Sequence, residues 1–577
     1  MSIQLVLSNY LSGLKERHEL DALLPELLKA MGHSVLSRPQ VGVGQGGVDV
    51  MSTFVSEDGI ETVFLFVIKF GDVKRSDLYS GDQAIDPSIR EACNDFVRNR
   101  IPATLQDKPK NIVLISNGEL RQEAQSGFAA LSSDVESRPL CSLHFWGTDQ
   151  LTPLIERHLF DEALLLSKGK SDLRAALAGL ENSDMAIHCF VRFVAHCFEK
   201  PDDEATSSNS TRRKRFLKRC AAAAMGWAVL LVWGKSEKNE KPGVVTGEFL
   251  ALYLWSEAVK DGLQEDEEFQ SRLSNVLKIQ TRALLEYFAK SAQQLMNREV
   301  VLLHRPERIF YADLIFEEMG RLATLILLLE KFPEFSTYRQ RTIQLSVYLV
   351  NAHTGCRLPV YDGQAIDISL LLSAWMGSAA WSHAKNLAFD IVDRLGHALA
   401  RNQYLPIDTD LIDDAIALNI TKTADSRDFF KTSSLIPALA TASAFLGSDD
   451  TIQLLNEKIQ PLLQEVTLER WYPQVALETL TASTQSVQDV GISRAIAKLY
   501  PSAAEERDSS LKVVKDAALP TDFKWHKNWE VLVALSARLH RHPLPTWYLA
   551  AKHQQGMQLT ASPVQESTTV DGKKTTS

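Results

Sequence analysis

Hydrophobic and polar positions follow two different periods along the first 165 residues. Apolar residues recur at helical spacing from Leu11 to Met31, and Pro25 is expected to kink or restart this helix. Further along, short apolar runs bounded by turn residues predict strands, and Asp58-Gly59 between two of these runs predicts a hairpin. The expected strands are Val35–Val41, Val48–Val55, Thr62–Phe70, Asn111–Ser116 and Cys141–Trp146, with helices over Asp86–Arg100 and after a cap at Thr148 or Asp149. Residues 1–165 are therefore expected to form an α/β domain.

The pattern changes near Ser167, and from there to about Gln555 almost every apolar stretch has helical spacing. No fixed-period repeat is visible, so residues 166–555 are expected to form a large all-α domain of packed helices, as one body or two subdomains. The segment from Arg357 to Ser369 is a conspicuous non-helical island and predicts a functional loop or an interface. Residues 556–577 are polar, have almost nothing to bury and are expected to be disordered.

The composition is that of an ordinary globular protein, with 45% hydrophobic residues and a formal net charge of -10. Because the net charge is negative, any contact with nucleic acid must come from a local basic patch. Six cysteines without a CxxC pair favour a reducing cytoplasm over a disulfide framework. No secretory signal is visible at the N-terminus. The longest apolar run, Cys220 to Gly234, is too short to span a bilayer and is expected to be a buried core helix.

Candidate chemistry is concentrated between Leu20 and Lys69. Asp21 lies on the first expected helix, Asp49 follows a glycine-rich turn at the start of a strand, and Lys69 interrupts an apolar strand. Neighbouring strands lie about 5 Å apart, so a hairpin would bring Asp49 and Lys69 together. Carboxylates bind divalent metals that activate water, and a lysine stabilises the charge that develops on a phosphodiester. The alternative is that Lys69 only marks where the strand reaches the surface.

These segments resemble the Mrr-type restriction endonucleases of the PD-(D/E)xK superfamily. Leu20-Asp21 stands where the family has Phe-Glu, Gly46-Gly47-Val48-Asp49 matches the second motif, and Val67-Ile68-Lys69 matches the third motif in its lysine. Asn111–Leu120 and His144–Glu156 are similar to later elements of the family, so the resemblance covers about residues 10 to 160. It implies a restriction-endonuclease-like α/β fold. It also implies Asp49, Lys69 and Asp21 as catalytic residues, and Mg²⁺ or Mn²⁺ held by Asp49, Asp21 and the carbonyl of Ile68.

Val67 departs from the family pattern, which has a carboxylate or an amide at this position. Valine offers no side-chain oxygen, and two interpretations stay open. The nuclease is either retired or weakened and kept for binding, or it is active with a ligand supplied from elsewhere. Candidates for that ligand are Asp21, Asp72, Asp82 and Gln83.

The resemblance implies a DNA-directed protein of bacterial defence against foreign DNA. The competing hypothesis is a catalytically inactive DNA-binding or scaffolding subunit of a multi-protein defence complex. The expected partners are DNA and further subunits of such a complex, with no membrane, and self-association into an oligomer is compatible with either hypothesis.

A second candidate site is a basic run in the helical region, made of Arg212, Arg213, Lys214, Arg215, Lys218 and Arg219. Six cations within eight residues would bind DNA phosphates with a strong dependence on salt. The alternative is a solvated helix start that follows an acidic loop, Asp202–Glu204.

Overall fold

The chain divides into two compact units. The first comprises Met1–Leu254 with Asp261–Ala283, and the second Trp255–Lys260 with Leu284–Ser577. The predicted boundary near residue 165 falls inside the first unit. The computed structural model describes residues 4–14, 19–37, 47–56, 58–80, 84–159, 169–200, 208–304, 308–376, 378–401, 406–409, 411–418, 429–473, 481, 492–516 and 529–541. The predicted tail, 556–577, lies outside these ranges.

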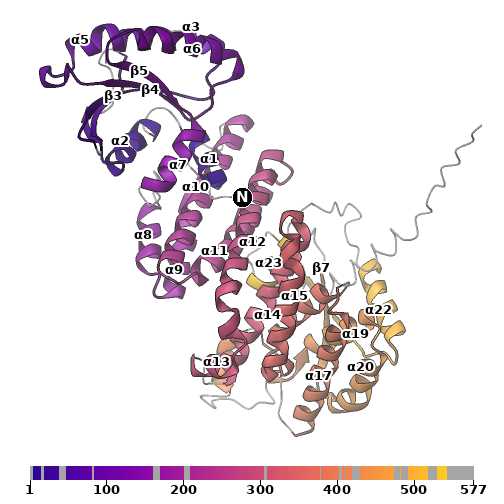
Figure 1. Ribbon diagram of the computed structural model, residues 1–577. Coiled ribbons are helices and arrows are strands. Elements are labelled where there is room, and N and C mark those ends of the chain that lie inside the picture. Colours follow the sequence, from indigo (N-terminus) through magenta and orange to yellow (C-terminus); the bar gives the residue numbers. More distant parts are fainter. Residues whose placement is uncertain are drawn as a thin grey trace, which may run out of the picture. The chain divides into compact units, whose positions relative to one another are not determined.

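A five-stranded mixed sheet forms the centre of the α/β part (Figure 1). Its strands are β1 (Ser34–Ser37), β2 (Val50–Val55), β3 (Glu61–Lys69), β4 (Lys110–Ser116) and β5 (Cys141–Trp146), hydrogen-bonded in that order. The first three strands are antiparallel, while β3, β4 and β5 are parallel to one another. The predicted hairpin is confirmed, since β2 and β3 pair from Val50–Phe66 to Val55–Glu61. The sequence therefore gives a mixed α/β arrangement in this region, as expected.

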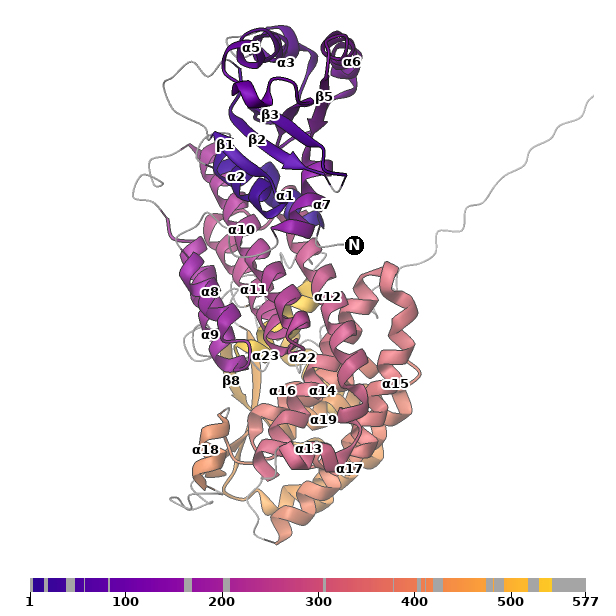
Figure 2. The same cartoon turned by 60° about the vertical axis from the view of Figure 1, so that its left-hand side comes forward.

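Helices lie on both faces of this sheet (Figures 1 and 2). The elements are α1 (Gln4–Ser12), α2 (Asp21–Ala30), α3 (Arg75–Tyr79), α4 (Ile85–Glu91), the π-helical turn η2 (Ala92–Phe96), α5 (Val97–Asn99), η3 (Ala103–Leu105), α6 (Gln122–Glu136) and α7 (Thr148–His158). On one face α3, α4 and α6 pack together, and α6 covers β5. On the other face α7 packs against α1, α2 and β5.

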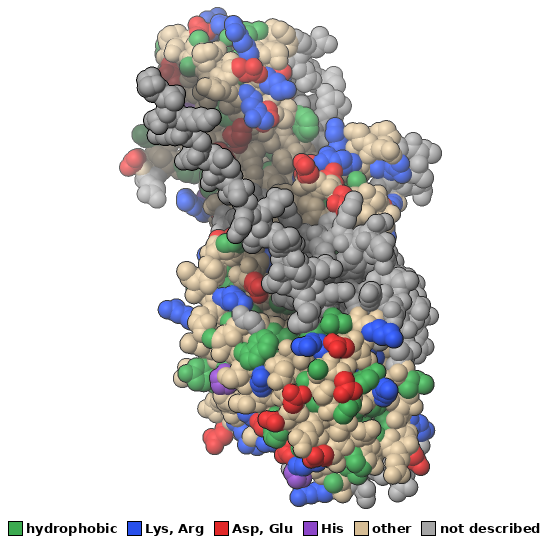
Figure 3. Space-filling model, turned by 90° about the vertical axis from the view of Figure 1, so that its right-hand side faces the viewer, with side chains coloured by type: hydrophobic (Ala, Val, Ile, Leu, Met, Phe, Trp, Pro, Cys, Tyr) green, Lys and Arg blue, Asp and Glu red, His purple; other side chains and the backbone are tan. Residues whose placement is uncertain are grey.

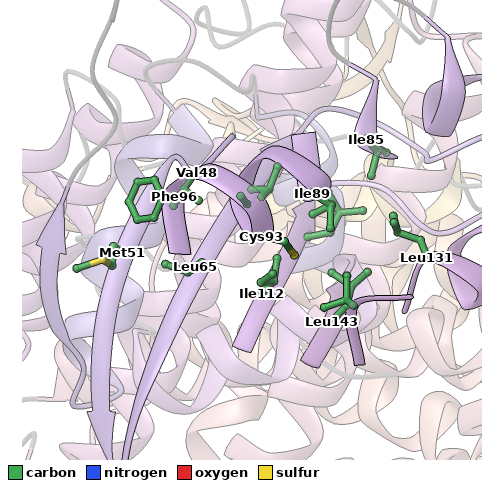
Figure 4. Close-up of a cluster of buried hydrophobic side chains, with 14 of the residues drawn as sticks. Val48, Met51, Leu65, Ile85, Ile89, Cys93, Phe96, Ile112, Leu131 and Leu143 are labelled. Atoms are coloured by element: carbon green, nitrogen blue, oxygen red, sulfur yellow. The ribbon is translucent and has the colours of Figure 1, made fainter. Parts of the chain in front are cut away.

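Alternating side chains of β3 divide between two cores. Val63, Leu65 and Val67 are at most 2% exposed and pack with residues of α4, η2 and α6 (Figure 4). Phe64 and Phe66 face the opposite way and stack on each other at 6.1 Å between ring centroids. Burial on both faces explains why the strand reads as an unbroken apolar run.

The aromatic core on the second face contains a buried histidine. His33 stacks on Phe54 with ring centroids 4.9 Å apart, and its Nδ1 lies 3.0 Å from the Ser52 hydroxyl. Burial lowers the pKa of His33 to about 4, because a charged imidazole would lose its hydration there. His33 is therefore a neutral structural residue at pH 7.

The start of α7 differs from the sequence prediction. Thr148 and Asp149 were the expected caps, but the cap residue is Gly147, whose N–H donates to Gln150 Oε1 at 3.0 Å. Thr148 instead donates its hydroxyl to the carbonyl of Asn117 at 2.9 Å. The prediction was wrong because a tertiary partner occupies the threonine side chain that would otherwise cap the helix.

Five further helices follow the α/β part, α8 (Lys170–Ala178), α9 (Ser183–Cys197), α10 (Asn209–Ser236), α11 (Lys241–Asp261) and α12 (Glu267–Leu295). Among the described residues α10 is the one helix long and apolar enough to cross a membrane, yet 72% of its apolar window is buried inside the protein. The predicted core role of the run Cys220 to Gly234 is confirmed for its central part, since Ala223 to Leu230 have buried side chains throughout, whereas Val232 and Trp233 are each 37% exposed. Helix α1 packs against α10 as well as α7, which joins the α/β part to these helices.

The second unit is mainly helical. Its helices are α13 (Arg298–His304), α14 (Arg308–Lys331), α15 (Ser336–Ala352), α16 (Ala365–Trp375), α17 (Trp381–Ala400), α18 (Ile412–Ile416), α19 (Leu435–Leu446), α20 (Asp449–Leu454), α22 (Ala503–Asp516) and α23 (Trp529–Leu539), with short turns η5 (Pro333–Phe335), η6 (Thr354–Arg357), η7 (Asp362–Gln364), η10 (Leu455–Ile459) and η11 (Gln460–Leu462). Helix α23 is central to the core, because Val531 to Ala537 are at most 1% exposed. The all-helical expectation was incomplete. A small sheet of β6 (Thr432–Ser433), β7 (Thr467–Pro473) and β8 (Ile492–Ile496) is also present.

The segment Arg357 to Ser369, predicted as a non-helical island, contains a buried turn that contacts the start of α19 in the second unit. Its latter half begins α16 at Ala365, so it is less irregular than expected. The carboxylate of Asp362 accepts hydrogen bonds from the Ser433 hydroxyl at 2.9 Å, from Ser434 N–H at 2.6 Å and from Leu435 N–H at 3.1 Å. These bonds satisfy the free amides at the start of α19, which explains why a polar residue lies in this buried turn.

Candidate functional site

Asp49 lies immediately before β2 and is held against β3 by two hydrogen bonds. Its N–H donates to the carbonyl of Phe66 at 2.8 Å, and its Oδ2 accepts the N–H of Ile68 at 2.7 Å. Because β2 and β3 are antiparallel, the start of β2 and the end of β3 lie at one edge of the sheet. The structure thus places the Asp49 carboxylate on the backbone of the residue that precedes Lys69.

The carbonyl of Ile68 has a defined direction. In an extended strand the N–H and C=O of one residue point to the same side, and the Ile68 N–H points to Asp49. The Ile68 carbonyl therefore points to the β2 side of β3, which is the side on which the Asp49 carboxylate lies. These two oxygen donors are the part of the predicted ligand set that the backbone brings together.

Val67 and Lys69 alternate with Ile68 and share the opposite sheet face from it. Val67 is 2% exposed and belongs to the hydrophobic cluster of the α4–α6 side. Lys69 is half-buried at the last position of β3, beside Ser116 at the end of β4. Val67 precedes the Ile68 amide that binds Asp49, and it has a hydrocarbon side chain at the position where the resemblance implies an oxygen donor.

Asp21 is the first residue of α2, a helix that packs against β1 and α7. Its Oδ1 is buried and has no hydrogen-bond partner among the described residues. A buried carboxylate oxygen without a partner costs free energy, and such an atom at a helix start needs a donor or a cation. Asp21 is thus the predicted site residue whose structural role within the fold is least explained.

The predicted ligands are oxygen atoms, which is the type that a hard divalent cation prefers, but they are too few to fill its coordination shell. Mg²⁺ takes six oxygen ligands and keeps several waters. The predicted set supplies carboxylates of Asp49 and Asp21 and the Ile68 carbonyl, and one Asp49 oxygen already accepts a backbone N–H. No group of three or more His, Cys, Asp or Glu that could hold a metal occurs within the described part of the chain. The ligand set is therefore incomplete.

Comparison with protein-family models, with curated proteins and with solved structures finds no match to this chain.

Both carboxylate oxygens of Asp72, a candidate substitute ligand, already accept hydrogen bonds from other residues of the protein. Its Oδ1 accepts the N–H of Glu119 at 2.9 Å and its Oδ2 accepts Arg121 Nε at 2.9 Å. The Glu119 amide and the Arg121 guanidinium hold the pKa of Asp72 below its usual value. Asp72 therefore joins the turns after β3 and β4. The other two substitutes, Asp82 and Gln83, lie outside the described residues.

Two further residues at this edge were missed by the sequence reading. Asn117, at the end of β4, is 2% exposed, and its Oδ1 accepts the N–H of Gly71 at 2.7 Å. Gly71 itself adopts a φ of 78°, which favours glycine in the turn after Lys69. The Asn117-Gly118 turn signal was visible in the sequence, but the partner of the asparagine side chain was not.

The basic run lies at the start of α10, and two of its cations pair with acids of the first unit. Arg213 Nε lies 2.6 Å from Asp266 Oδ2, and its Nη2 lies 3.1 Å from Glu268 Oε2. Lys218 forms an ion pair with Glu19. Neither cation is therefore simply presented to solvent.

The remaining four cations of the run differ in exposure. Arg219 is 9% exposed and Arg215 is half-buried, whereas Arg212 and Lys214 are exposed. Basic and acidic side chains are interspersed on the face shown in Figure 3. Binding of DNA phosphates by all six cations would need the Arg213 and Lys218 pairs to break, so Arg212 and Lys214 are the members best placed for the predicted contact.

Proposed function

We propose that this is a cytoplasmic DNA-directed protein of bacterial defence against foreign DNA, whose α/β part is a nuclease-like domain with a weakened metal site. The observation that supports the proposal is the hydrogen bond between the Asp49 carboxylate and the Ile68 amide at 2.7 Å. It joins the second and third motifs of the resemblance at the edge where β3 ends in Lys69. The sheet of β1 to β5, with its mixture of antiparallel and parallel strand pairs, is compatible with a restriction-endonuclease-like fold.

The chemistry expected at this edge is metal-assisted hydrolysis of a phosphodiester. When bound, a divalent cation would lower the pKa of a water molecule and polarise the phosphate. Asp49 and the Ile68 carbonyl would hold it, and the Lys69 ammonium would stabilise negative charge on the phosphate oxygens. With Val67 in place of an oxygen donor, weak metal binding is expected.

A second function, a non-catalytic DNA-binding or scaffolding subunit, is favoured by one observation. The Val67 side chain is part of the hydrophobic core, so the fold has no vacancy at the position of the missing ligand. Such packing is expected if the site lost its activity and an apolar core residue replaced the former carboxylate residue.

Cleavage of DNA by the purified full-length chain distinguishes the two functions. Any cleavage is expected to need Mg²⁺ or Mn²⁺, and Asp49→Ala and Lys69→Ala are each expected to reduce it below detection. Asp58→Ala, in the exposed β2–β3 turn, is the matched control and should leave it unchanged. Cleavage that persists in EDTA, or in both site variants, would show that the site has been placed wrongly. The absence of cleavage under all conditions would favour the non-catalytic function.

A further inference from the structure

Helix α10 contacts the chain just before Asp21 through the side chain of Lys218. The Lys218 side chain passes the end of α1, since a Cβ at Gly13 would lie 3.8 Å from Lys218 Cγ. Its ammonium then pairs with the carboxylate of Glu19, two residues before Asp21. The side chains of Lys218 and Glu19 are 35% and 21% exposed, so the pair is partly shielded from solvent.

Asn117 joins the end of α1 to the turn that follows Lys69. Its Nδ2 donates to the carbonyl of Leu14 at 2.7 Å and to that of Leu11 at 3.2 Å. Its Oδ1 accepts the N–H of Gly71 at 2.7 Å. A buried asparagine that uses both ends of its amide holds two backbone segments at a fixed distance.

The two contacts are close in sequence, since Asn117 binds Leu11 and Leu14 at the end of α1 and Lys218 binds Glu19 just before α2. We infer that Lys218 and Asn117 are positioning residues for the candidate site. Lys218 fixes the segment that carries Asp21, and Asn117 couples the end of α1 to the turn after Lys69. The helical region thus acts on the site through α10 and α1. The inference rests on the proposed function only for the roles of Asp21 and Lys69.

The same contacts assign a second role to the basic run. A cation used for DNA phosphates must be free to meet them, whereas Lys218 pairs with Glu19 inside the first unit. Lys214, four residues earlier on the same helix, is exposed. The run therefore contains cations paired within the first unit, such as Lys218, and exposed cations, such as Lys214.

Hydrogen exchange of the full-length chain, measured by mass spectrometry, tests the inference without any need for activity. Lys218→Met keeps the aliphatic stem over Gly13 and removes the charge. It is expected to speed exchange several-fold in two peptides, one around Asp21 and one containing the Gly71 amide. Asn117→Ala should speed exchange at Gly71 in the same way. Lys218→Arg keeps the charge and should show the same exchange rates as the wild type. Lys214→Met is the matched control and should not change exchange in either peptide.

Three outcomes would overturn the inference. These are a change in Lys218→Met confined to α10 and Glu19 with Gly71 unaffected, no recovery in Lys218→Arg, or an equal effect of Lys214→Met. If Lys218→Met does not fold, Glu19→Gln breaks the same pair from the other side and carries the same expectation. Because exchange is independent of cleavage, failure of the nuclease proposal leaves this result readable, and the converse also holds.

Discussion

Replacing Gly47 with alanine is expected to lower the free energy of unfolding of the first unit by about 2–5 kcal/mol. Gly47 adopts a φ of 77°, which costs an L-residue roughly 1–2 kcal/mol. A Cβ there would lie 2.3 Å from the carbonyl oxygen of Ser88 and 3.2 Å from the amide nitrogen of Ala92. Both atoms are backbone of the α4–η2 region and cannot rotate away, which adds about 1–3 kcal/mol of overpacking.

Gly59 in the β2–β3 turn is the matched control for this substitution. It has the same φ of 77°, but no atom lies within 4 Å of its Cβ position. Gly59→Ala is therefore expected to cost only the roughly 1–2 kcal/mol of the backbone conformation. Chemical denaturation of both variants measures the difference. Equal losses would mean that α4 does not restrict the loop before Asp49, and the glycine of that motif would then need another explanation.

Replacing Arg321 with alanine is expected to destabilise the second unit by about 3–5 kcal/mol, the largest single effect we expect there. Arg321 is 1% exposed, and its guanidinium lies 2.5 Å from Glu318 and 2.6 Å from Glu317. Glu318 is 0% exposed and also accepts the Tyr287 hydroxyl at 3.0 Å. Without Arg321 the Glu318 carboxylate would be left as a buried charge that has lost its cation.

The ion pair between Arg339 and Glu330 provides the control in the same unit. It spans 3.3 Å, with side chains 30% and 48% exposed, so Arg339→Ala should cost no more than about 1 kcal/mol. Adding Glu318→Gln to Arg321→Ala should recover part of the loss, since it removes the unpaired charge. Thermal unfolding of the four proteins tests both statements. A loss in Arg321→Ala as small as that in Arg339→Ala would contradict them.

The strands of the α/β part were predictable because their signal is local. The apolar run of β3 is buried on both faces, and β4 and β5 begin and end within one residue of the predicted positions. The hairpin followed from Asp58-Gly59, where Gly59 has the expected positive φ. The juxtaposition of Asp49 with the end of β3 followed in turn from the hairpin. By contrast, the second sheet was missed because β6 has only two residues and because Glu469 and Arg470 leave β7 without an apolar run.

Long-range contacts account for most of the remaining differences. Asn117 meets Leu11 and Leu14 from a position more than a hundred residues away, and no spacing in the sequence indicates this. The acid partner of Arg213 in α10, Asp266, lies beyond α11, so a local reading of six clustered cations suggested a DNA-binding surface. The burial of Val67 was visible as hydrophobicity, but only the packed core shows which space its side chain fills.

The stability of Val67→Glu as a function of Mn²⁺ concentration tests whether Val67 stands in the place of a lost metal ligand. A glutamate at this 2%-exposed position should lower Tm in EDTA, because burial of a charge is costly. Val63→Glu, on the same strand and 0% exposed, is the matched control for that cost. We expect Mn²⁺ to raise the Tm of Val67→Glu and to leave wild type and Val63→Glu unchanged, and we expect Asp49→Ala to abolish the rise. Tight binding of Mn²⁺ by the wild type with no gain in Val67→Glu would contradict the account, and Asp21 would then be the first residue to test as the ligand that replaced position 67.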